Sequence, residues 1–129
     1  MRILACLLLA ALSLPLRAAA AWPERPVTMI VPFAAGGPTD VVARIVGEHM
    51  SRTLGQQLVI QNLSGAGGTV GSTRAMRSDP DGYTILMTLS SISIFPVSDP
   101  LQGKPVPYQI SDFMPIALVS ADPTVLVVR

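Results

Sequence analysis

The sequence has almost none of the residues from which metal and thiol sites are built. Its 129 residues include one cysteine and one histidine. Cys6 lies in an apolar run near the amino terminus, so the rest of the chain has no disulfide or thiol chemistry. His49 has no second histidine or cysteine with which to share a metal, and a site of the usual ligand count cannot be formed. We therefore expect no metal and no cofactor.

Basic residues are also few. Nine Lys and Arg residues face eight Asp and Glu residues, which gives a formal net charge of +1. Without Arg2 and Arg17, which belong to the amino-terminal segment, seven bases and eight acids give −1. This balance leaves no basic footprint for nucleic acid.

The first 21 residues predict a secretory signal peptide. Arg2 supplies the positive start, residues 3–16 are apolar apart from one serine and one proline, and residues 18–21 are all alanine. The apolar run is short for a membrane span, which needs roughly 20 residues. We expect cleavage near Ala20 or Ala21, a periplasmic location and no stable membrane anchor. An uncleaved anchor is the alternative.

A strand, a glycine-rich turn and a helix start follow one another in VTMIVPFAAGGPTD, residues 27–40. Strand-forming residues occupy 27–31, and Pro32 ends the strand because it has no backbone donor. Gly36 and Gly37 permit a tight turn or a close approach to a ligand, and the Pro-Thr-Asp that follows predicts a helix start. Peptide amides at such a start, together with the helix dipole, form an anion site that needs no Lys or Arg.

Thr39 and Asp40 each have two interpretations. Asp40 either caps the helix and complements its positive end, or it faces a cleft and binds the amine of a zwitterionic ligand. Thr39 is either the N-cap residue or a donor to the ligand. The pattern alone leaves both pairs of interpretations open.

Helix and strand signals alternate after this stretch. Residues 39–54 predict an amphipathic helix that ends at Gly55, and Leu58–Ile60 predicts the next strand. A second glycine-rich loop at 62–72 leads into a short helical segment, and 83–89 predicts a third strand. This order predicts an α/β fold with a parallel sheet and right-handed crossovers.

Ligands bind such sheets outside the carboxyl ends of the strands. Both glycine-rich loops and the Thr and Ser residues after the third strand would lie at that edge. We therefore predict a binding site made of Phe33, Ala34, Ala35, Gly36, Gly37, Thr39, Asp40, Gly65, Ala66, Gly67, Gly68, Thr88, Ser90 and Ser91.

The last third of the chain has weaker signals. Four prolines rule out a long helix between residues 93 and 109. Residues 113–119 and 124–128 are apolar and predict two further strands. Because the chain stops inside the second of these, we expect a truncated copy of a longer protein.

Enzymatic activity finds little support in the sequence. Residues 65–71 have the spacing G-x-G-x-x-x-G, which is not that of a dinucleotide loop, and no acid follows at the end of a strand about twenty residues later. Ser90 and Ser91 have no histidine nearby, and His49 belongs to a helix that leaves the opposite end of the sheet. A nucleotide-binding α/β enzyme is thus the weaker alternative, and we expect no enzymatic activity.

Five short motifs occur in order along the chain. They are PV…VPFxxGGxTD at 26–40, LGQ at 54–56, GAGG at 65–68, PDGYT at 80–84 and DF at 112–113. Together they resemble the Bug family, the extracytoplasmic substrate-binding proteins of tripartite tricarboxylate transporters. The resemblance implies an incomplete Venus flytrap, that is, a parallel-sheet lobe of the periplasmic-binding-protein type. It also implies a small carboxylate held by amides and waters of the first two loops, and membrane permease subunits as partners.

The chain departs from the family pattern in two respects. Family members are more than twice as long, and the segment around Phe95 and residues 105–109 differs from the usual sequence. A secreted orphan or signalling receptor without a transporter is the alternative within this family. The implied division is a signal peptide at 1–21, the amino-terminal part of a first lobe at 22–109, and the start of a crossover or second lobe at 110–129.

Overall fold

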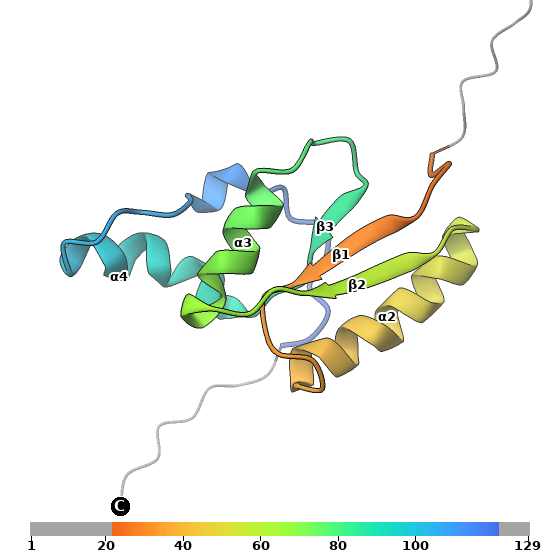
Figure 1. Cartoon of the computed structure of the whole chain (residues 1–129), viewed down its shortest axis with the longest axis horizontal. Helices are drawn as coiled ribbons and strands as arrows, with labels where there is room; N and C mark the ends of the chain where they lie inside the picture. Colours follow the sequence, from red (N-terminus) through yellow and green to blue (C-terminus); the bar gives the residue numbers. More distant parts are fainter. Residues whose placement is uncertain (1–21, 122–129) are drawn as a thin grey trace, which may run out of the picture.

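A three-stranded parallel sheet is the centre of the structure, a computed structural model that describes residues 22–121 (Figure 1). β1 (Val27–Val31) is the middle strand, and β2 (Leu58–Asn62) and β3 (Thr84–Leu86) pair with it on either side. In the order β2-β1-β3, a connection must cross the sheet before β2 pairs with β1, and another before β3 pairs with β1. The predicted α/β fold with a parallel sheet is therefore confirmed.

β1 is apolar apart from Thr28 because both of its faces are covered. Val27, Met29, Ile30 and Val31 are each at most 3% exposed. A strand buried on two faces has a continuous apolar sequence instead of an alternating one. The run of strand formers in the sequence thus reflects the central position of β1.

α2 (Pro38–Leu54) covers one face of the sheet and packs on β1 and β2. Its apolar side places the fully buried Ala43 against the odd-numbered residues of β1. Gly55 ends the helix in the left-handed conformation, as predicted, with φ +69°. The N-cap residue is Gly37, so the interpretation of Thr39 as the N-cap is wrong.

α3 (Thr69–Met76) packs on β1 and β3, and Figure 1 shows it on the side of the strands opposite α2. Gly71 permits the close approach of this helix. A Cβ atom at Gly71 would lie 2.7 Å from the Leu63 carbonyl oxygen and 2.8 Å from Pro32 Cα. The start of α3 is therefore held directly against the backbone that leaves β1 and β2.

The predicted third strand is longer than the observed one. Residues 83–89 were expected to be extended, whereas β3 spans Thr84–Leu86. A 3₁₀ turn, η2 (Ser90–Ser93), and a short helix, α4 (Phe95–Leu101), follow it. α4 has seven residues and a proline in its first turn, which agrees with the prediction that this segment forms no long helix.

The strand predicted at 113–119 is absent. After the 3₁₀ turn η3 (Ile110–Asp112) the chain forms no regular element up to residue 121. Met114, Ile116 and Leu118 are 90%, 79% and 81% exposed. Alternating apolar residues form a strand only beside a partner strand, and the described residues provide none here. The strand predicted at 124–128 lies outside the described residues. Within residues 22–121, no helix has both the length and the apolar content needed to cross a bilayer.

Gly71→Ala tests the close packing of α3. In an exposed helix, replacing glycine by alanine raises the free energy of unfolding by about 1 kcal/mol. Here we expect it to lower the free energy of unfolding by about 1–3 kcal/mol, because the methyl group has no room. Urea unfolding followed by circular dichroism measures the difference.

Gly55→Ala is the matched control for this experiment. A Cβ atom at Gly55 would meet nothing within 4 Å, so its cost is limited to the left-handed backbone, about 1–2 kcal/mol. An unchanged or increased stability of Gly71→Ala would contradict the packing described here.

Candidate functional site

The carboxyl ends of all three strands lie at one edge of the sheet. The first loop (residues 32–37) leaves β1 toward α2, the second loop (63–68) leaves β2 toward α3, and η2 follows β3. In a sheet of order β2-β1-β3 the connections diverge between β1 and β3. Such a point of divergence is where open α/β sheets bind ligands.

The first loop depends on its two glycines. Gly36 has φ +80°, a conformation that favours glycine. Gly37 donates its N–H to the Ala34 carbonyl oxygen at 3.3 Å, and a Cβ atom at Gly37 would lie 3.2 Å from that oxygen. Gly36 and Gly37 therefore form the tight turn that the sequence permits at this position.

A buried carboxylate fixes the shape of this loop. Asp40 is 2% exposed, and its Oδ2 accepts hydrogen bonds from the Gly36 amide at 2.8 Å and from Arg44 Nε at 2.9 Å. Its Oδ1 accepts a hydrogen bond from Asn62 Nδ2 at 3.0 Å. Asn62 is the last residue of β2 and also donates to the Phe33 carbonyl oxygen at 3.1 Å. Asp40 thus joins the first loop, α2 and the end of β2.

These contacts keep Asp40 ionised. The hydrogen bond from Arg44 is the largest cause that holds the pKa of Asp40 well below its usual range. The Gly36 amide and Asn62 lower this pKa further, while burial acts in the opposite direction. Asp40 does not cap α2, because Gly37 is the N-cap residue and no side chain caps the helix, but Asp40 lies in the first turn and complements its positive end. Both carboxylate oxygens already accept hydrogen bonds, so the contacts favour this structural role over binding the amine of a ligand.

Not every amide of the first loop is open to a ligand. Gly36 and Gly37 donate to Asp40 and to Ala34, as described above. The amides of Thr39 and Asp40 are in the first turn of α2, where no carbonyl of the helix lies four residues earlier. Both residues are buried, at 7% and 2% exposed, and their backbone amides belong to the positive end of the helix.

The second loop has an unusual run of left-handed residues. Gly65, Ala66, Gly67 and Gly68 have φ values of +141°, +45°, +67° and +102°. The Gly68 amide donates to the Gly65 carbonyl oxygen at 2.9 Å. Ala66 and Gly67 are exposed, and their amides donate to no other group of residues 22–121. A non-glycine residue in this conformation is uncommon and often marks a functional site.

The three segments are brought together at the sheet edge. The Phe33 ring lies 3.4 Å from the position of a Cβ atom on Gly68, and η2 contacts the turn η1 (Ala66–Gly68). Ser90 is exposed, whereas Thr88 and Ser91 are half-buried. All the predicted residues therefore belong to this edge. Sequence reasoning missed Arg44 and Asn62, although the spacing of Arg44 four residues after Asp40 is that of a helical ion pair.

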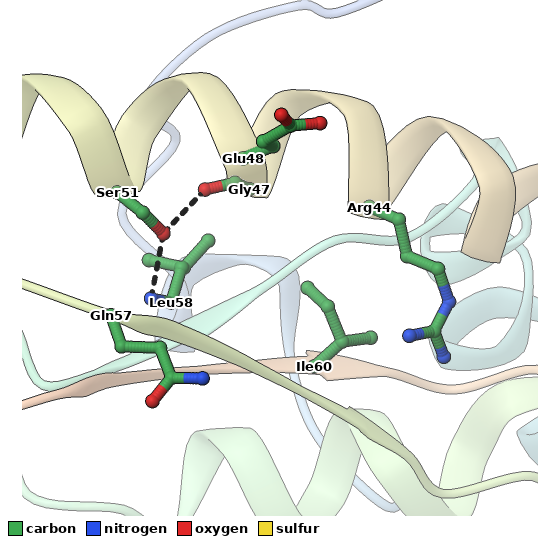
Figure 2. A pocket seen from close by; sticks show the side chains of 7 residues that line it. All are labelled: Arg44, Gly47, Glu48, Ser51, Gln57, Leu58 and Ile60. Atoms are coloured by element: carbon green, nitrogen blue, oxygen red, sulfur yellow. Dashed lines mark hydrogen bonds between the residues drawn. The ribbon is translucent and has the colours of Figure 1, made fainter.

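A separate hollow of about 310 Å³ lies between α2 and β2 (Figure 2). Ser51 crosses it: its hydroxyl donates to the Gly47 carbonyl oxygen at 2.7 Å and accepts from the Leu58 amide at 2.8 Å. Leu58 and Ile60 are its apolar residues. None of its lining residues belongs to the predicted site, and the hollow is a seam where the helix is attached to the edge strand.

Residues 42–129 match the sequence profile of the tripartite tricarboxylate transporter family receptor, TctC. The chain belongs to the TctC family. The members of this family are transporter binding proteins and not enzymes. The match to this family confirms the resemblance to the Bug proteins. The TctC match begins within α2, after the first loop, and covers the rest of that helix, β2, the second loop, α3, β3 and the residues that follow.

Individual relatives agree with this assignment. A UPF0065 protein of Agrobacterium vitis is 43% identical over 109 residues, which are 84% of this chain and 30% of that protein. BugT of Bordetella pertussis is 43% identical over 108 residues, 82% of this chain and 32% of that protein. The chain thus spans about a third of the length of these TctC-family relatives.

Solved structures resemble the fold as well. A periplasmic transporter protein is 43% identical, with a TM-score of 0.58 over 68% of this chain and 29% of that one. An R. palustris protein solved with adipate is 41% identical, with a TM-score of 0.50 over 51% of this chain and 22% of that one. The α/β fold of this chain therefore matches part of periplasmic binding protein structures.

Asp40→Asn tests the buried network. The variant keeps the shape of the side chain but loses the charge that Arg44 and the Gly36 amide stabilise, so we expect it to be less stable than the parent at pH 7. Because folding lowers the pKa of Asp40, its contribution is complete above the usual carboxyl pKa of about 4 and is lost as the pH falls below it. The difference between parent and variant should therefore shrink between pH 5 and pH 2. Urea unfolding at several pH values measures it.

Glu48→Gln is the control on the same helix. Glu48 pairs with Arg52 at the surface, where both side chains are more than 60% exposed, so this change should have little effect at any pH. A pH-independent difference for Asp40→Asn would contradict the assigned role of the charge.

Proposed function

We propose that the chain carries the carboxylate-binding loops of an extracytoplasmic solute-binding protein for tripartite tricarboxylate transport. The observation that carries this proposal is the meeting of two glycine-rich loops at one sheet edge, with the Ala66 and Gly67 amides open and no Lys or Arg in either loop. An anion at such a site is held by amide dipoles and the helix dipole.

The geometry of the two loops supports a carboxylate in particular. The edge carries peptide donors in two elements, the first-turn amides of α2 at the buried residues Thr39 and Asp40 and the open amides of Ala66 and Gly67 in the second loop. A carboxylate has two acceptor oxygens and can accept more than one such donor. The adipate found in one solved relative is such a carboxylate, which supports the same ligand class here.

The proposed binding residues are those predicted at the three strand ends. Asp40 and Thr39 act through their backbone, and the Asp40 side chain holds the loop. Thr88, Ser90 and Ser91 add hydroxyl groups from the β3 side. The complete set is Phe33, Ala34, Ala35, Gly36, Gly37, Thr39, Asp40, Gly65, Ala66, Gly67, Gly68, Thr88, Ser90 and Ser91.

The partners follow from the family. Residues 22–109 would form part of a first lobe and 110–129 the start of a connection to a second lobe, as in a Venus flytrap. The ligand would be handed to membrane permease subunits from the periplasm. One open edge contacts only one side of a ligand, so the described loops should bind it weakly by themselves.

A titration of the purified chain with adipate tests this function. Charge-assisted hydrogen bonds each contribute about 1.5–3 kcal/mol, and association costs an estimated 4 kcal/mol or more. Two or three such bonds give a dissociation constant of about 1 mM or weaker. ¹H–¹⁵N NMR spectra should show shifts of the loop glycine amides with adipate and none with adipamide, which lacks the charge.

Gly36→Val and Gly103→Val distinguish an effect on the first loop from a general loss of structure. Both glycines have positive φ and open space around a Cβ atom, but Gly103 follows α4. Gly36→Val should abolish the shifts, while Gly103→Val should keep them. Equal responses from adipate and adipamide, or binding unchanged by Gly36→Val, would refute this site.

A further inference from the structure

Another hollow lies at the end of the sheet opposite the two glycine-rich loops. It has a volume of about 270 Å³ and is lined by the end of α3 and by the first residues of β1 and β3. Figure 1 shows this end of the sheet, where β1 and β3 begin. Thr28 and Thr84 line the hollow from these two strands, where they are Cα partners, and both are half-buried. The hollow shares no residue with the proposed carboxylate site.

Three arginines line this small space. Arg25 precedes β1, and Arg74 and Arg77 belong to the end of α3. Arg25 is held in place from two sides. Its guanidinium carbon lies 3.8 Å from the centroid of the Tyr83 ring, and its Nη2 donates to Asp81 Oδ2 at 3.0 Å. One guanidinium group is thus fixed at the hollow before any ligand binds.

The other two arginines have no carboxylate partner among residues 22–121. Arg74 Nη1 donates to the neutral hydroxyl of Ser78 at 3.2 Å. The side chain of Arg77 makes no hydrogen bond or ion pair within the same residues. The two arginines of α2, in contrast, each pair with a carboxylate. A guanidinium group has five N–H donors, so most of those on Arg74 and Arg77 remain available to a ligand.

Two carboxylates also line the hollow, and one of them is already satisfied. Asp81 pairs with Arg25, and its Oδ1 accepts a hydrogen bond from the Tyr83 amide at 2.9 Å. Asp79 is exposed and is the carboxylate of the hollow that no arginine pairs with. Three arginines against two aspartates leave a net charge of +1. An anion in the hollow is therefore attracted overall and is repelled chiefly by Asp79.

We propose that this hollow binds a phosphate group. Guanidinium groups suit phosphate because two parallel N–H groups can donate to two of its oxygens. The hydroxyls of Thr28, Ser78 and Thr84 add neutral donors. The volume is below the roughly 300–1,000 Å³ of pockets for organic ligands, which suits a small anion. This proposal does not depend on the carboxylate site at the other end of the sheet.

Titration of the full chain with sodium phosphate at constant ionic strength tests the proposal. ¹H–¹⁵N NMR should show saturable shifts of the Ser78 amide and of the Arg77 Nε–H group, whereas chloride should cause none. Arg77→Gln should weaken phosphate binding about tenfold. Asp79→Asn should strengthen it about threefold, because it removes a like charge. Arg52→Gln is the matched control, since it removes an equal charge from the surface of α2, and it should leave the affinity unchanged.

Phosphate groups occur both on the free anion and on the headgroups of anionic phospholipids, and vesicle sedimentation distinguishes the two. If the chain sediments with phosphatidylglycerol vesicles but not with phosphatidylcholine vesicles, and Arg77→Gln abolishes this, the site takes a lipid headgroup. A response to free phosphate without vesicle binding assigns the site to the free anion.

The absence of both responses would overturn the proposal and leave Arg74 and Arg77 only the role of complementing the negative end of α3. Shifts confined to the glycine amides of the second loop, equal shifts with chloride, or an affinity unchanged by Arg77→Gln would overturn it as well. The dispersion of the amide spectrum shows that each variant is folded, and Arg74→Gln serves if Arg77→Gln is not.

Discussion

The buried Asp40 carboxylate is the interaction on which the arrangement of the strand ends depends. It holds the Gly36 amide, the Arg44 side chain and the Asn62 side chain at once, and these belong to a loop, a helix and a strand. A buried charge is tolerated only where it is paired and hydrogen-bonded. The first loop is therefore preorganised before any ligand arrives, and its shape does not rely on the ligand.

Glycines fix the position of the second loop, as Asp40 does for the first. Gly71 allows α3 to contact the backbone at Pro32, and Gly68 accommodates the Phe33 ring. Glycine at these positions brings backbone close to backbone, so both loops present peptide groups and no charged side chains. Peptide dipoles oriented in this way can hold an anion without a charged side chain.

The sequence predicts those features that depend on local patterns. The buried run of β1, the amphipathic α2 and the end of that helix at Gly55 were all predicted because periodicity and glycine act within a few residues. The prediction of a strand at 113–119 is wrong because a strand needs a partner strand, and no local pattern encodes that partner. The contacts of Asp40 with Asn62 and of Gly67 with Phe95 join residues 22 and 28 positions apart, and single-sequence reasoning has no signal for such pairs.

The central position of β1 also affects how the chain can fold. Both pairings of β1 join it to strands that come after a complete helical crossover, so every hydrogen bond between strands in residues 22–121 closes a long loop. Such non-local contacts form slowly. The most apolar segment of the sheet is synthesised first and has no partner on one side until Thr84–Leu86 follows. During this interval the apolar β1 has an unpaired edge through which it can associate with other chains.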